Sequence, residues 1–120
     1  MYELNFDFKK KKLTISGDTK PCENLMKYGQ LADVLLHEVF IEDEIHSLFK
    51  MRNKKTLHNV KAYHTTSTIV GKVAKITRCK KLVLTHFVPT QFNEKKLIDI
   101  VTKDLGKKPI IGKDLLKITI

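Results

Sequence analysis

Few features of this sequence point beyond one small folded domain. Only Cys22 and Cys79 are cysteines among the 120 residues, which excludes a disulfide scaffold and a thiolate zinc cage. The longest apolar runs, such as Leu82–Leu84, are too short to span a bilayer. The first residues have neither the basic nor the apolar region of a signal peptide. We therefore expect one domain over residues 1–120, soluble, cytoplasmic and without a membrane partner.

Arginine and tryptophan are also scarce. Tryptophan is absent, and only Arg52 and Arg78 are arginine among the 23 cationic residues, so that lysine accounts for the other 21. A net charge of +10 suggests a polyanionic partner. Proteins that recognise phosphate nevertheless tend to use the planar arginine fork, and single-strand binders use stacking aromatics. A small basic nucleic-acid-binding module is therefore one hypothesis, which charge alone does not decide.

Strand-like and helix-like patterns alternate along the chain. The expected elements are a hairpin over 2–8 and 13–16, a helix from Thr19 to Gly29, a strand over 32–36, a helix over 42–51, a helix after Thr65-Thr66-Ser67, a strand over 81–85, a helix between Asn93 and Gly106, and short strands at 109–111 and 115–120. This order predicts an α/β layer architecture.

Polar residues follow three of the apolar strands. Asp18, the pair His37-Glu38 and His86 each come at an expected strand end, and His64 precedes a capped helix. Because ligands bind beyond the carboxyl ends of strands in open α/β sheets, these groups could converge on one edge. Carboxylate and imidazole are suitable zinc ligands. The structural alternatives stay open: a turn with a helix cap at Asp18, a partly buried His37, and a loop role for His64. His46 and His58 are interpreted as surface residues.

Four segments, taken together, carry a family resemblance. They are Ile15–Thr19, Ala32–Glu38, Tyr63–Ser67 and Leu82–Phe87, and their order and spacing resemble the motifs of metallo-β-lactamase fold hydrolases, in the branch of ribonuclease Z and its arylsulfatase-like relatives. The tail Ile110–Leu115 is similar to the closing segment of that family. The resemblance implies the C-terminal half of an αβ/βα sandwich, a mixed sheet with helices on one face.

The resemblance also implies roles for four residues. Asp18 corresponds to the carboxylate that bridges two metal ions, usually zinc, and His86 to the last histidine ligand. His64 corresponds to the acid that protonates the leaving oxygen while metal-activated water attacks, and Glu38 to the carboxylate that orients this histidine. Val39-Phe40 and Thr65-Thr66 depart from the ribonuclease Z motifs towards the arylsulfatase-like ones. The implied substrate is therefore an RNA phosphodiester or a small sulfate or carboxylic ester.

A missing motif limits what these 120 residues can do. The His-x-His-x-Asp-His motif, which supplies most metal ligands in the family, does not occur in them. Asp18 and His86 alone cannot hold two ions. A half-sandwich also leaves an apolar sheet face bare, which predicts a chain that is marginally folded alone, self-associates or docks onto a separate N-terminal half. We expect a hydrolase portion that is inactive in isolation; the alternative is a non-catalytic truncated remnant or split half.

Overall fold

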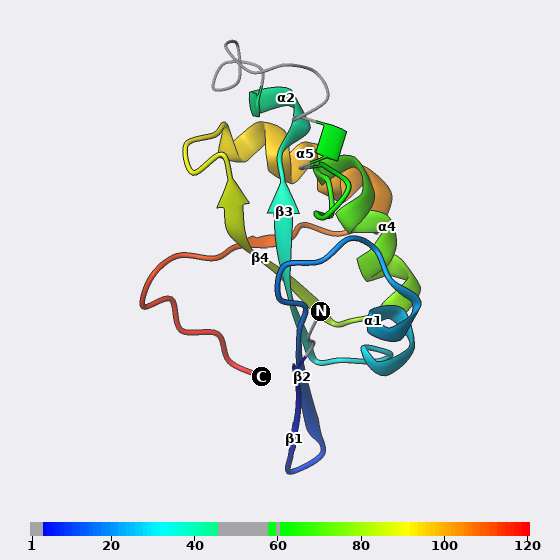
Figure 1. Ribbon diagram of the computed structural model, residues 1–120. Helices are drawn as coiled ribbons and strands as arrows, with labels where there is room; N and C mark the ends of the chain where they lie inside the picture. Colours follow the sequence, from blue (N-terminus) through cyan, green and yellow to red (C-terminus); the bar gives the residue numbers. More distant parts are fainter. Residues whose placement is uncertain (1–3, 46–57, 60) are drawn as a thin grey trace.

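The structure is a computed structural model that describes residues 4–45, 58–59 and 61–120. Its framework is a five-stranded mixed sheet, most of which can be followed in Figure 1. The strands are β1 (Leu4–Phe8), β2 (Lys11–Ile15), β3 (Val34–Phe40), β4 (Lys81–Val88) and β5 (Ile110–Ile111). They lie in the order β1-β2-β3-β4-β5. β1 and β2 form an antiparallel hairpin, and the later pairs are parallel. The expected hairpin and mixed sheet are confirmed.

Helices connect the parallel strands, as parallel pairing requires. They are α1 (Glu23–Tyr28), α2 (Glu42–Ile45), α4 (Ser67–Thr77) and α5 (Glu94–Leu105). The predicted boundaries of α5 are confirmed: the Asn93 side chain accepts a hydrogen bond from the Lys96 N–H at 3.1 Å, and Gly106 ends the helix in the left-handed region with φ 84°. Of the helix expected over 42–51, the structure describes residues 42–45; the rest, with His46, lies outside the described residues.

The first helix begins later than predicted. We expected it to start at Thr19, but α1 begins at Glu23. Thr19 is held away from a helix by contacts with distant segments: its N–H donates to the Glu38 carboxylate at 3.3 Å, and its carbonyl accepts from the Thr65 hydroxyl at 2.6 Å. These long-range hydrogen bonds override the local helix signal.

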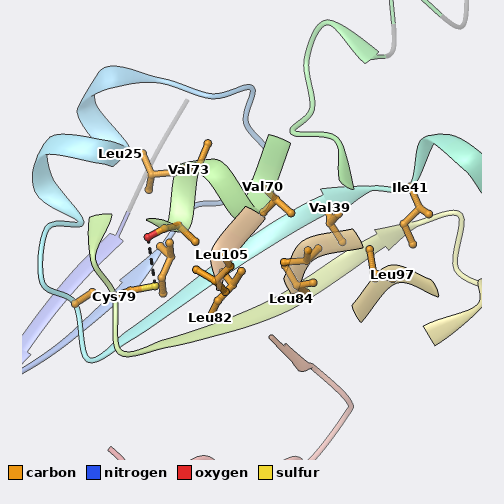
Figure 2. Packing of buried hydrophobic residues seen from close by; sticks show 14 residues of the cluster. Leu25, Val39, Ile41, Val70, Val73, Cys79, Leu82, Leu84, Leu97 and Leu105 are labelled. Atoms are coloured by element: carbon orange, nitrogen blue, oxygen red, sulfur yellow. Dashed lines mark hydrogen bonds between the residues drawn. The ribbon is translucent and has the colours of Figure 1, made fainter. Parts of the chain in front are cut away.

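The hydrophobic core lies between the sheet and the helix layer (Figure 2). Alternate residues of β3 and β4 point to the helices, where they pack on α4 and α5. The buried side chains that Figure 2 labels are Leu25, Val39, Ile41, Val70, Val73, Cys79, Leu82, Leu84, Leu97 and Leu105. The helices therefore cover one face of the sheet, as expected for a half-sandwich.

The opposite face of the sheet is exposed at its hairpin edge, whereas Val34 and Val83 on its central strands are 3% and 1% exposed. Leu4, Phe6 and Phe8 of β1 lie on it and are 53%, 53% and 72% exposed. The C-terminal segment reaches part of this face, where Leu116 and Ile118 line a pocket with residues of β3 and β4. The strand predicted over 115–120 is wrong, because this segment has no regular structure. The Thr119 carbonyl accepts a hydrogen bond from the Lys81 ammonium at 2.7 Å.

Both central strands are longer than their apolar cores predicted. β3 runs on to Phe40 and β4 to Val88, so Glu38 and His86 lie within strands and not beyond them. Glu38 pairs with Thr85, and His86 lies between Thr85 and Phe87, which both pair with β3. The continued pairing of β3 with β4 explains why both strands are longer than predicted. None of the described helices is long and apolar enough to cross a membrane. The cytoplasmic location stays a prediction.

Candidate active site

The loop after β2 presents Asp18 at the carboxyl end of the sheet. The Ser16 N–H donates to the Leu36 carbonyl at 2.9 Å, and the Ser16 hydroxyl accepts from the Glu38 N–H at 3.2 Å, which ties the end of β2 to β3. Gly17 then adopts φ 62°, a left-handed conformation that glycine takes without a steric penalty. The turn leaves the Asp18 side chain 56% exposed.

A β-bulge in β4 presents His86 at the same end of the sheet. Glu38 pairs with Thr85, and the next residue, Val39, pairs with Phe87, so His86 is the extra residue of β4. It has φ 48°, which is uncommon for a residue other than glycine. Bulges bend a strand and redirect a side chain, and they are frequent next to active sites. The sequence shows no signal for this bulge, because it depends on the register between two strands.

Asp18 and His86 meet at this edge. The Asp18 Oδ1 and the His86 Nε2 are 3.2 Å apart, and both side chains are 56% exposed. A carboxylate oxygen and an imidazole nitrogen are the donor types that zinc takes. These two residues therefore converge on one edge of the sheet, as predicted.

Glu38 forms the second part of the site and is buried beneath the surface. Its carboxylate accepts from the Thr65 N–H at 2.8 Å and from the Thr19 N–H at 3.3 Å. The side chain is 1% exposed, and this burial raises the pKa of the carboxyl, while the Thr65 N–H and His64 act in the opposite direction. Glu38 thus joins β3 to the loop after β2 and to the loop before α4.

His64 lies against Glu38, which is the pairing that the family resemblance implied. Its Nδ1 is 3.3 Å from the Glu38 Oε2, and its ring stacks on Phe40 with centroids 5.7 Å apart and planes inclined by 16°. A carboxylate at Nδ1 fixes the ring orientation and leaves Nε2 as the nitrogen available to another group. The two pairs are linked through the chain, because Thr19, which follows Asp18, donates to Glu38.

His37 belongs to the core and not to the site. It is fully buried on the helix side of β3, and its Nδ1 donates to the Glu38 carbonyl at 2.8 Å. Burial lowers the pKa of His37 to about 4, so the ring is neutral at physiological pH. Its Nε2 has no hydrogen-bond partner among the described residues. His37 is thus a structural residue, as the alternative interpretation held, but it is fully and not partly buried, and its neighbour Glu38 alone reaches the site.

Three contributors were missed from the sequence. Phe40 packs on the His64 ring, and the backbone N–H groups of Thr19 and Thr65 hold Glu38. The sequence singled out Phe40 as a departure from the family motif, but it did not predict that the Phe40 ring would pack on His64. Backbone donors carry no residue-type signal, since every residue except proline has one.

The residues present do not make a complete metal site. Among the residues that the structure describes, no group of three or more His, Cys, Asp or Glu side chains could hold a metal ion. Structural zinc sites use four protein ligands, and catalytic ones use three. Asp18 and His86 have the right chemistry for two of these positions, and no step of the reaction can be derived from this pair alone.

Comparison with known proteins places these features in a class. No protein-family model matches the chain. The metallo-β-lactamase fold protein YhfI of Bacillus subtilis superimposes with a TM-score of 0.71 over 93% of this chain and 40% of its own, at 19% identity. Human tRNase Z, short form, superimposes with a TM-score of 0.52 over 71% of this chain and 30% of its own, at 29% identity. The chain therefore has part of a metallo-β-lactamase fold.

The curated relatives narrow this class to one branch. The ribonuclease Z of Picosynechococcus sp. is 31% identical over 115 residues, which is 92% of this chain and 33% of that protein. A zinc phosphodiesterase ELAC protein 2 homolog of Caenorhabditis elegans is 39% identical over 77 residues, 64% of this chain and 8% of that protein. The chain is thus a partial ribonuclease Z-like sequence, matching a third or less of the length of these relatives.

Proposed function

We propose that this chain is the C-terminal portion of a metal-dependent hydrolase that cleaves RNA phosphodiester bonds of the 3′-end type. The observation that supports it is the assembled His64–Glu38 pair, 3.3 Å apart, at the same sheet end as the Asp18–His86 pair. The relatives named ribonuclease Z and tRNase Z support the choice of RNA.

In this proposal His64 donates the proton that the leaving oxygen needs. Glu38 is a positioning residue: it accepts from Nδ1, which leaves Nε2 as the nitrogen available to the leaving oxygen. The hydrogen bonds from Thr65 and Thr19 keep the carboxylate in place. Phe40 restricts the ring from one side.

Asp18 and His86 are proposed as two ligands of a two-zinc site whose other ligands lie outside these 120 residues. The exposed hairpin edge of this sheet face, with Leu4, Phe6 and Phe8, is proposed as the surface on which an N-terminal half or a second copy packs. A size-exclusion profile of the chain alone tests this packing surface. Self-association is expected, and a stable compact monomer would count against it.

Reconstitution tests the function. The chain is co-expressed with the N-terminal half of a ribonuclease Z that carries the missing histidine motif, and cleavage of a precursor tRNA is measured together with bound zinc. We expect Asp18→Ala and His86→Ala to lose metal and activity. His64→Ala should lose at least about a hundredfold in rate, the usual contribution of a general acid, while it keeps its metal. Full activity of His64→Ala would refute the role of His64.

Phe40 favours a second candidate, an esterase acting on small sulfate or carboxylic esters. It stands where the ribonuclease Z motif has threonine, and its ring fills the space beside His64. The reconstituted protein is assayed with an aryl sulfate, an aryl carboxylic ester and a phosphodiester. Faster hydrolysis of either of the first two would favour the esterase. No turnover of any substrate, with zinc in excess, would favour a non-catalytic remnant.

A further inference from the structure

A cationic groove lies on the outer side of the helix layer, apart from the candidate active site. We define it by Lys72, Lys75, Ile76 and Arg78 along α4 and its end, and by Lys103 and Asp104 of α5. The three lysines and Arg78 are exposed, whereas their neighbours Val73, Ala74 and Val101 are buried in the core. The groove therefore faces away from the sheet.

Close contact between α4 and α5 brings these charges together. At Gly71 an added Cβ would lie 2.9 Å from the Val101 carbonyl oxygen and 3.0 Å from the Asp104 Cβ, so only glycine allows the helices to approach this far. Lys72 follows that contact on α4, and Lys103 lies beside it on α5. Arg78 ends α4 with φ 56°, a left-handed cap.

The charges in the groove are not neutralised by the protein. Four cations face one carboxylate, and none of the four takes part in an ion pair among the described residues. Other lysines of the chain are paired, for example Lys61 with Glu42 at 2.7 Å. Attraction to the helix dipole accounts for Lys75 and Lys103 in the last turns, but not for Lys72 in the middle of α4.

We propose that this groove binds the phosphate backbone of RNA. Lysine ammonium groups are point charges that contact phosphates, and the groove has no aromatic side chain on which a base could stack. Binding is therefore independent of base sequence and steeply dependent on salt. Among the residues that the structure describes, Ile76 is the one large apolar side chain that lines the groove, which is too little for insertion into a lipid surface. The choice of RNA over an acidic protein rests on the proposed function.

Fluorescence anisotropy of the full 120-residue chain with a labelled single-stranded RNA tests the groove across a range of salt concentrations. The groove variant is K72E/K75E/K103E. The control is K10E/K95E/K117E, which changes the net charge equally at scattered exposed positions. Circular dichroism verifies the fold of both, and the neutral variant K72Q/K75Q/K103Q replaces the first if charge reversal unfolds the chain.

We expect the groove variant to lose at least about tenfold in affinity at low salt. Its salt slope should fall by about 2, since each lost contact with a single strand removes about 0.7. The control should lose much less, and two RNAs of different sequence should bind alike. Equal losses in both variants would show that only net charge matters and would overturn the proposal. Stronger competition by polyglutamate than by unlabelled RNA would also overturn it, in favour of an acidic protein.

This test separates the groove from the proposed hydrolase function. Binding is measured without metal and without an N-terminal half, so it does not depend on cleavage. Undiminished binding by the groove variant would refute the groove alone. Groove-dependent binding in a chain that yields no cleavage after reconstitution would refute the hydrolase and leave the RNA-binding surface standing.

Discussion

The two halves of the candidate site are built differently. Asp18 and His86 are about half exposed and contact each other at 3.2 Å, whereas Glu38 is almost fully buried and accepts hydrogen bonds from two other segments of the chain. The buried half is complete within this chain. The exposed half offers two ligands where a metal needs more. Under the proposed function, the half that holds the His64–Glu38 pair is preassembled, whereas the half that holds Asp18 and His86 needs further metal ligands.

Removing the carboxylate of Glu38 should have the largest effect on stability. In Glu38→Ala the N–H groups of Thr65 and Thr19 lose their acceptor in a buried place, which costs about 3 kcal/mol of unfolding free energy. Urea denaturation measures it. Asp18→Ala is the matched control on the exposed half and should change stability by less than about 0.5 kcal/mol. Equal changes in unfolding free energy for Glu38→Ala and Asp18→Ala would contradict the difference between the buried and the exposed half.

Acid should destabilise the buried interior through His37. Its folded pKa is lowered to about 4 from 6.5, so its contribution is present above pH 6.5 and is lost as pH falls towards 4. At pH 5 the unfolding free energy lost through His37, relative to neutral pH, is about 2 kcal/mol. Burial of Glu38 raises its pKa and contributes with the opposite sign, so the difference between wild type and His37→Leu isolates His37.

Thermal denaturation at several pH values measures this contribution. His37→Leu should lose much of the acid sensitivity that the wild type shows between pH 6.5 and 4. His86→Leu, which changes an exposed histidine of the neighbouring strand, should keep it. If both variants retain the wild-type profile, His37 is not the group responsible.

A smaller effect is expected from the ring that packs on His64. Phe40→Leu keeps an apolar side chain in a fully buried position but removes the stacked ring, and it should cost about 1 kcal/mol. The NMR signals of the His64 ring should broaden or shift, because one side of the ring is no longer restricted. Unchanged His64 signals would mean that Glu38 alone orients the ring.

The sequence predicted more of the exposed half than of the buried half. Asp18 follows a glycine after a strand, and His86 follows an apolar strand, so local patterns indicated both. The hairpin and the α5 caps were predicted in the same way, whereas the single helix layer was implied by the family resemblance. Glu38 and His64 were matched as a pair only through the family resemblance, since they are 26 residues apart in sequence.

The failed predictions share a cause in long-range contacts. The late start of α1 follows from the bonds that hold Thr19 to Glu38 and Thr65. The extension of β3 and β4 and the bulge at His86 follow from the pairing of these two strands. None of these contacts has a local pattern, because each depends on where another segment lies in the fold.

Zinc titration followed by NMR tests the central claim most directly. The claim is that this chain supplies two metal ligands beside a preassembled His64–Glu38 pair. It predicts weak zinc binding that shifts the signals of Asp18 and His86 first, is abolished in Asp18→Ala/His86→Ala, and leaves the His64 ring in place. Tight, stoichiometric zinc binding that persists in the double variant would contradict it.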